Sequence, residues 1–186
     1  VNEIYFRRTQ PNPDQAEGRR RLQHKIDLIN RSPELAPYKD AELRSRKLAQ
    51  ALARLGCAPG DRVGTLAWNG YRHFEIYFGT SGSQLVCHTI NPRLFPEQIV
   101  WIASDAADKV LCFDLNFLPL VEKLAGQLPS VEHFVVMTDR AHMPASTSLT
   151  NLLCYDELVE AEDGNYQWPD FDENTASSIC YTSGTT

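Results

Sequence analysis

The sequence predicts an α/β fold in which repeated βα units build a mostly parallel sheet with helices on both of its faces. Two observations carry this prediction. Apolar runs of strand length recur at regular intervals, and a helix-compatible segment lies between each pair. The runs are continuously apolar rather than alternating, which is typical of strands that are buried on both faces.

The first half of this alternation follows from local patterns. Residues 41–55 carry leucine and alanine at helical spacing, and Gly56 is predicted to end that helix. A short apolar strand is then expected at 63–68, a largely buried aromatic helix at 71–81, and a second strand at 84–90.

The second half continues the same rhythm. Pro96 is expected in the first turn of the next helix, because proline lacks the N–H that this turn leaves unbonded. The later elements are expected as follows: strand 109–113, helix 117–128, strand 132–137, polar loop 139–151, short acidic helix 153–162, acidic turn-rich segment 163–175 and strand 178–181. The acidic stretch is interpreted as a solvated surface.

Composition excludes some classes of function. The net charge of −6 over 186 residues argues against general nucleic-acid binding, which needs a basic surface. No apolar run approaches the roughly 20 residues that span a bilayer. The five cysteines form no CxxC pair, and their odd number does not suggest a disulfide framework. Cys87, Cys112 and Cys180 lie in or beside apolar runs and are expected to be core residues. This pattern favours a reducing, cytoplasmic setting.

The last residues carry a candidate for phosphate binding. An apolar strand leads directly into Thr182, Ser183, Gly184, Thr185 and Thr186. Hydroxyl groups donate hydrogen bonds to phosphate oxygens, and glycine lets backbone N–H groups come close. The segment has no lysine or arginine and lacks the ending of a P-loop. The alternative interpretation is a polar chain end without a ligand.

YTSGTT resembles the start of the signature YTSGTTGxPKG of the adenylate-forming enzymes, which include acyl-CoA synthetases, luciferases and the adenylation domains of peptide synthetases. The resemblance extends upstream through RKLAQALARLGCAPGDRVGTLAWNGYRHFEIYF, LVCHTINPRLFPEQIVWIASDAADKVLCFD and WPDFDENTASSICYTSGTT. The AWN-YRHFE-YF and HTINPRL strings are most similar to the branch that acts on medium- and long-chain fatty acids.

The resemblance implies the activity of an acid–thiol ligase. A carboxylate would attack the α-phosphorus of ATP to give an acyl-adenylate and pyrophosphate, with Mg²⁺ neutralising phosphate charge, and coenzyme A would then displace AMP. The residues from Thr182 to Thr186 would contact the β- and γ-phosphates, chiefly for positioning and charge stabilisation. The resemblance identifies no catalytic residue within this chain.

Three residues at strand ends are weaker candidates. His88 resembles a family position near the acyl site, although a histidine there is more often a structural polar group. Asn91 is the second candidate for substrate binding, with a simple turn as the alternative. Trp68 ends a strand at the carboxyl edge, where open α/β sheets bind ligands, and is interpreted as core. His24, His73, His133 and His142 have no partners at metal-ligand spacing, so no metal site is predicted.

Residues 1–37 match nothing in the family pattern and are set apart as an extension, mobile or foreign to the domain. Residues 38–186 are expected to form part of the N-terminal AMP-binding domain, cut within the phosphate-binding loop. The chain is therefore expected to be an inactive fragment of a fatty acid–CoA ligase that uses ATP, Mg²⁺ and coenzyme A. The alternative is a non-catalytic α/β module that binds a nucleotide or a partner. Oligomeric state is not predicted.

Overall fold

The computed structural model describes residues 36–182, and within them the fold is a six-stranded, entirely parallel sheet in the order β5-β4-β3-β1-β2-β6. The strands are β1 (Arg62–Leu66), β2 (Val86–Thr89), β3 (Asp108–Phe113), β4 (His133–Val136), β5 (Leu152–Cys154) and β6 (Ser178–Cys180). The α/β prediction is confirmed, and the predicted strands β1, β2, β3, β4 and β6 all form.

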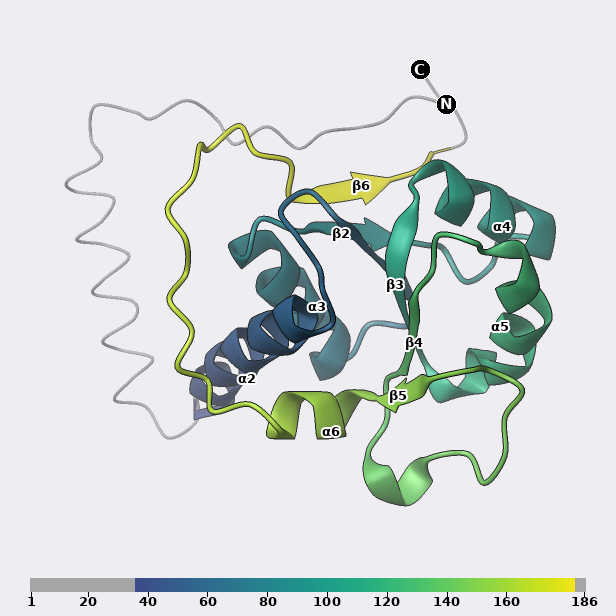
Figure 1. Ribbon diagram of the computed structural model, residues 1–186, viewed down its shortest axis with the longest axis horizontal. Coiled ribbons are helices and arrows are strands. Elements are labelled where there is room, and N and C mark those ends of the chain that lie inside the picture. Colours follow the sequence, from purple (N-terminus) through teal and green to yellow (C-terminus); the bar gives the residue numbers. More distant parts are fainter. Residues whose placement is uncertain (1–35, 183–186) are drawn as a thin grey trace.

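Helices cover both faces of the sheet (Figure 1). On one face lie α2 (Ala36–Arg54), α3 (Tyr71–Gly82) and α6 (Tyr155–Glu160), and on the other lie α4 (Pro96–Asp105) and α5 (Leu118–Leu124). Short 3-10 turns occupy Leu115–Phe117, Ala125–Gln127 and Arg140–His142. Each face has its own hydrophobic core, with Leu52 and Ile76 in the first and Ile99 and Val121 in the second.

The predicted helix ends have the expected geometry. Gly56 follows α2 with φ +85°, a left-handed conformation that glycine adopts without a Cβ clash. The N–H of Cys57 donates to the carbonyl of Leu52, which closes a Schellman-type C-terminus. Pro96 is the first residue of α4, as predicted.

The predicted acidic helix at 153–162 is wrong at its start. Residues Leu152–Cys154 form β5, which pairs with β4, and the helix spans only Tyr155–Glu160. A segment of three residues is too short for its sequence periodicity to reveal a strand. It becomes a strand because its backbone hydrogen-bonds to β4. The predicted helix 117–128 is likewise shorter, because α5 is flanked by 3-10 turns at both ends.

An ion-pair network joins the three helices of one face. The Arg44 guanidinium donates to Glu75 at 2.7 Å and to Asp156 at 2.8 Å. Arg72 donates to the same Asp156 carboxylate at 2.6 Å, and the Tyr155 hydroxyl donates to Glu75 at 2.9 Å. Two positive and two negative side chains therefore balance one another between α2, α3 and α6.

Candidate functional site

The carboxyl ends of the strands bring the predicted site residues to one edge of the sheet. Because all strands are parallel, Trp68 after β1, Asn91 after β2 and Thr182 after β6 follow neighbouring strand ends. Thr182 is exposed. Ser183, Gly184, Thr185 and Thr186 lie outside the described residues, so the rest of the predicted loop stays a prediction.

Tyr181, which directly precedes Thr182, is held from several directions. Its hydroxyl donates to the Asp105 carboxylate at the end of α4, at 2.8 Å. Its ring meets Trp101 of α4 edge-on, with centroids 6.0 Å apart, and the His88 ring at 5.2 Å. The last residue before the predicted loop is thus fixed to both the sheet and a helix.

His88 belongs to a dry pair with Asp108 beneath Tyr181. Both side chains are fully buried, and His88 Nδ1 lies 2.8 and 2.9 Å from the two carboxylate oxygens of Asp108. Burial raises the pKa of Asp108, and the hydrogen bond from His88 offsets this only in part. Gly64 leaves room for the carboxylate, since a Cβ there would come within 2.6 Å of Asp108 Oδ2.

The other ring nitrogen of His88 is buried and has no hydrogen-bond partner among residues 36–182. Buried polar atoms are usually hydrogen-bonded, so this nitrogen is an exception among the described residues. Among the described residues His88 has no exposed surface. Its direct contact with a substrate therefore stays a prediction.

Asn91 and Trp68 differ in their surroundings. The Asn91 side-chain oxygen accepts from the N–H of Arg93 at 3.0 Å, the geometry of a turn, while the residue remains exposed. Its role in substrate binding also stays a prediction. The interpretation of Trp68 as core is wrong, because the residue is 48% exposed. Its backbone N–H donates to the Asp114 carboxylate at 2.7 Å, and its ring centroid lies 5.5 Å from that of Phe117.

The cysteine predictions hold for two of the three residues. Cys87 and Cys112 are buried, and burial raises the pKa of the Cys87 thiol to about 12. Cys180 is exposed, so its assignment to the core is wrong. Cys180 lies in β6, which pairs only with β2 in the described part of the chain and so forms an edge of the sheet. An apolar run predicts a strand but not whether that strand lies at an edge.

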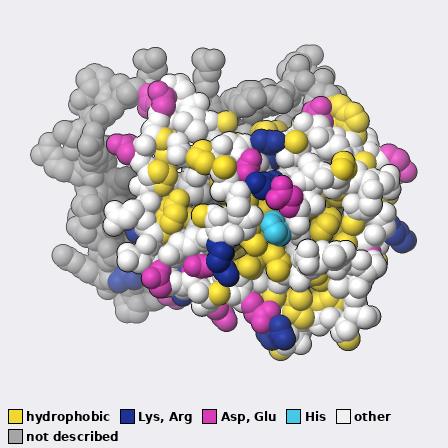
Figure 2. All heavy atoms as spheres, viewed as in Figure 1, with side chains coloured by type: hydrophobic (Ala, Val, Ile, Leu, Met, Phe, Trp, Pro, Cys, Tyr) yellow, Lys and Arg dark blue, Asp and Glu magenta, His cyan; other side chains and the backbone are white. Residues whose placement is uncertain are grey.

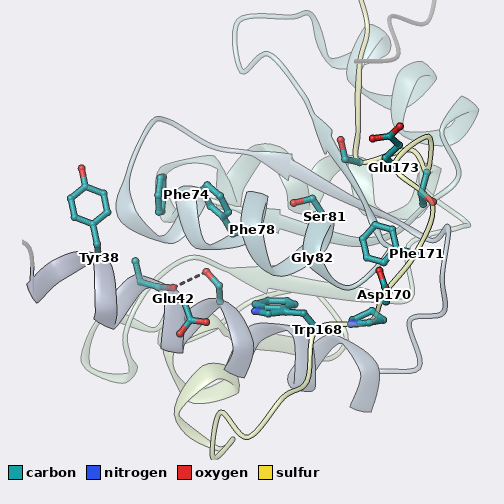
Figure 3. A pocket seen from close by; sticks show the side chains of 15 residues that line it. Tyr38, Glu42, Phe74, Phe78, Ser81, Gly82, Trp168, Asp170, Phe171 and Glu173 are labelled. Atoms are coloured by element: carbon teal, nitrogen blue, oxygen red, sulfur yellow. Dashed lines mark hydrogen bonds between the residues drawn. The ribbon is translucent and has the colours of Figure 1, made fainter. Parts of the chain in front are cut away.

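Sequence reasoning missed a groove on the opposite side of the molecule from α4. A cavity of about 570 Å³ lies between α2, α3 and the segment before β6 (Figure 3). Aromatic side chains that line it are Tyr38, Phe74, Phe78, Trp168 and Phe171. The charged lining residues are Glu42, Asp170 and Glu173, all acidic. The predicted acidic segment 163–175 therefore lines one side of the cavity as well as forming part of the protein surface. Its negative charge disfavours anionic ligands in the cavity.

The visible surface mixes both signs of charge. On the face shown in Figure 2, acidic and basic side chains lie interspersed around hydrophobic ones. Among the described residues no group of three or more His, Cys, Asp or Glu side chains could hold a metal ion. Within residues 36–182, no helix is long and apolar enough to cross a membrane.

Comparison with known proteins identifies relatives of this chain. It is 56% identical over 142 residues to the 3-methylmercaptopropionyl-CoA ligase of Ruegeria lacuscaerulensis, covering 76% of this chain and 26% of the relative. It is 51% identical over 149 residues to the medium-chain-fatty-acid–CoA ligase of Ectopseudomonas oleovorans, covering 80% and 27%. The chain thus spans about a quarter of the length of these relatives.

Solved structures support the same fold. An anthranilate CoA ligase in complex with anthranoyl-AMP superposes with a TM-score of 0.69 at 24% identity, covering 79% of this chain and 26% of that one. The family model "AMP-binding enzyme" matches residues 17–186, so the match begins within the predicted extension 1–37. The division at residue 37 stays a prediction. From its sequence match and its fold, the chain belongs to the AMP-binding enzyme family, in the acyl-CoA ligase branch.

Proposed function

We propose that this chain is the front part of the nucleotide-binding domain of an ATP-dependent fatty acid–CoA ligase. The observation that carries the proposal is a sequence identity of more than 50% to two CoA ligases over at least 76% of the chain. The exposed Thr182, which follows an anchored Tyr181 at the carboxyl edge of the sheet, supports it.

The proposed reaction has two steps. The carboxylate oxygen of a fatty acid attacks the α-phosphorus of ATP, which releases pyrophosphate and forms an acyl-adenylate. The thiol of coenzyme A then attacks the acyl carbon, AMP leaves, and the thiol proton is released. The adenylate step is needed because a carboxylate is a poor electrophile until its oxygen is bound to a good leaving group.

In this proposal the loop contributes by positioning. The residues that contact the β- and γ-phosphates are Thr182, Ser183, Gly184, Thr185 and Thr186. Their hydroxyl and backbone N–H groups hold the phosphate tail while the α-phosphorus meets the carboxylate. Mg²⁺ binds mainly through substrate phosphates and water. We therefore assign the ion to the phosphates of bound ATP.

A chimera tests the proposal. Residues 38–186 would replace the matching segment of the Ectopseudomonas medium-chain ligase, and ATP–pyrophosphate exchange would be measured with octanoate and with 3-(methylthio)propionate. We expect exchange that depends on the carboxylate. The isolated 186-residue chain should show none. A folded chimera without exchange would overturn the proposal.

A matched pair of variants tests the loop in the same chimera. Thr182→Ala should raise the KM for ATP about 10- to 100-fold, as expected for a lost hydrogen bond to a charged group. Thr175→Ala, in the segment before β6, should leave it unchanged. Equal KM values for ATP in the two variants would remove Thr182 from the phosphate site.

A further inference from the structure

The position of Tyr181 relative to the sheet is set by strand register. In the parallel pairing of β2 with β6, His88 lies opposite Ile179. Side chains alternate along a strand, so Tyr181, two residues after Ile179, lies on the same face of the sheet as His88. Their ring contact at 5.2 Å follows from this register.

The contacts of Tyr181 differ in how strongly water competes with them. Trp101 is 49% exposed and Asp105 is exposed, so both can move and exchange partners with solvent. His88 has no exposed surface, and Asp108 holds one of its ring nitrogens. The histidine ring is therefore the rigid side of the contact.

The His88–Asp108 pair is also costly for the fold. It buries a carboxylate whose pKa is raised by burial, and it leaves one histidine nitrogen without a partner among the described residues. It requires glycine at position 64 on the neighbouring strand. A purely apolar pair of similar volume would fill this place without these costs.

We propose that His88, held by Asp108, is a positioning residue that fixes Tyr181 and thereby sets where the phosphate-binding loop begins at Thr182. The proposal deepens the function proposed above and rests on it for the role of the loop. His88 acts through Tyr181 and does not itself touch ATP. Its effect is to keep the first loop residue at the carboxyl edge of β6.

The structural half of the proposal can be tested by NMR on the full 186-residue chain. We expect a nuclear Overhauser contact between the His88 and Tyr181 rings. His88→Ala and Asp108→Ala should shift the signals of Tyr181 and Thr182. Asp108→Asn, which keeps a hydrogen-bonding group of the same size, should restore the parent signals.

Cys87→Ala is the matched control, because Cys87 is the buried neighbour of His88 in β2 and packs in the core of the opposite face. It should leave Thr182 unshifted. Absence of the His88–Tyr181 contact in the folded parent chain would overturn the proposal, even if the alanine variants fail to fold. A Thr182 signal in His88→Ala that equals that of the control would overturn it too.

The functional half uses the chimera. His88→Ala should raise the KM for ATP about tenfold and leave the KM for the carboxylate unchanged, whereas a general loss of folding would lower the active fraction alone. Asp108→Asn should stay near the parent value. A parent-like KM for ATP in His88→Ala would overturn the inference. A parent chimera without exchange would instead overturn the proposed function, and the NMR result would then decide the positioning role.

Discussion

The two faces of the sheet use buried charge in different ways. Beneath α2, α3 and α6, four charged side chains form a balanced network whose arginines keep about a fifth of their surface in water, at 23% for Arg44 and 20% for Arg72. Beneath α4, the His88–Asp108 pair, here called the dry pair, is completely buried. The network joins helices to one another, while the dry pair lies under the end of β6. The network therefore contributes to helix packing, whereas we proposed above that the dry pair acts on the geometry of one strand end.

The electrostatics of the two carboxylates reflect this difference. Burial acts to raise the pKa of Asp156, but hydrogen bonds and charge from Arg72 and Arg44 lower it overall. For Asp108 burial dominates, and the pKa is raised in spite of the contact with His88. Two arginines outweigh the loss of hydration where one histidine does not.

The largest expected effect comes from removing the buried acid of the network. Glu75 is 1% exposed and binds both Arg44 and the Tyr155 hydroxyl. Glu75→Ala should lower the free energy of unfolding by about 3–5 kcal/mol, because Arg44 loses one of its two carboxylate partners, the buried Tyr155 hydroxyl loses an acceptor and a cavity remains. Glu75→Gln should lower the free energy of unfolding less than Glu75→Ala does. Urea denaturation measures both.

Glu42→Ala is the control for that experiment. Glu42 pairs with Arg46 on the exposed side of α2, and such pairs contribute about 0.3–0.5 kcal/mol. If Glu75→Ala were no more harmful than Glu42→Ala, the network would not stabilise the helix face.

The second prediction concerns the dry pair. Gly64→Ala should lower the free energy of unfolding by about 1–3 kcal/mol, because the added Cβ meets the Asp108 carboxylate. The effect should shrink when Asp108 is also replaced by alanine. A double-mutant cycle measures this coupling. Additive effects would show that the carboxylate does not occupy the space above Gly64.

The positions of most strands along the chain could be predicted from sequence, whereas these charge partners could not. The strands β1, β2, β3 and β4 are apolar runs bounded by turn residues, and periodicity detects them. Arg44 and Asp156 are 112 positions apart, and no local pattern links them. The partner of His88 is 20 positions away on a strand that is not its neighbour. The contact therefore depends on the placement of β1 between β2 and β3 in the sheet.

Two further features depended on tertiary context. β5 forms through pairing with β4, although its three residues precede a helix that looked continuous with them. Trp68 is exposed at a strand end, although its residue type and the preceding apolar run favour burial. For the candidate site, the sequence predicted the strand that leads to Thr182 but not the contacts of Tyr181 with His88, Trp101 and Asp105.

The third prediction is that Asp156 and Asp108 make stability respond to pH with opposite signs. The lowered pKa of Asp156 means that its contribution to stability is present above its ordinary value of 3.8 and is lost as pH falls below it. The raised pKa of Asp108 means that the folded state holds this proton more tightly. Stability should therefore fall as pH rises from 3.8 toward its folded pKa.

Urea midpoints measured across this range test the signs. Asp156→Asn should reduce the loss of stability below pH 3.8. Asp108→Asn should remove the fall in stability above pH 3.8. If Asp108→Asn kept the parent slope above that pH, the raised pKa would not contribute to folding.

The smallest expected effect lies in the aromatic groove of the first face. Phe78 is 53% exposed and pairs with Phe74 at 4.7 Å between centroids. Because half of its surface already meets water, Phe78→Ala should lower the free energy of unfolding by no more than about 1 kcal/mol. Phe113→Ala is the control in the core of the opposite face, where the ring is fully buried and about 3–5 kcal/mol should be lost. A loss of that size for Phe78 would mean that the groove is closed in solution and that its aromatic lining belongs to the core of the first face.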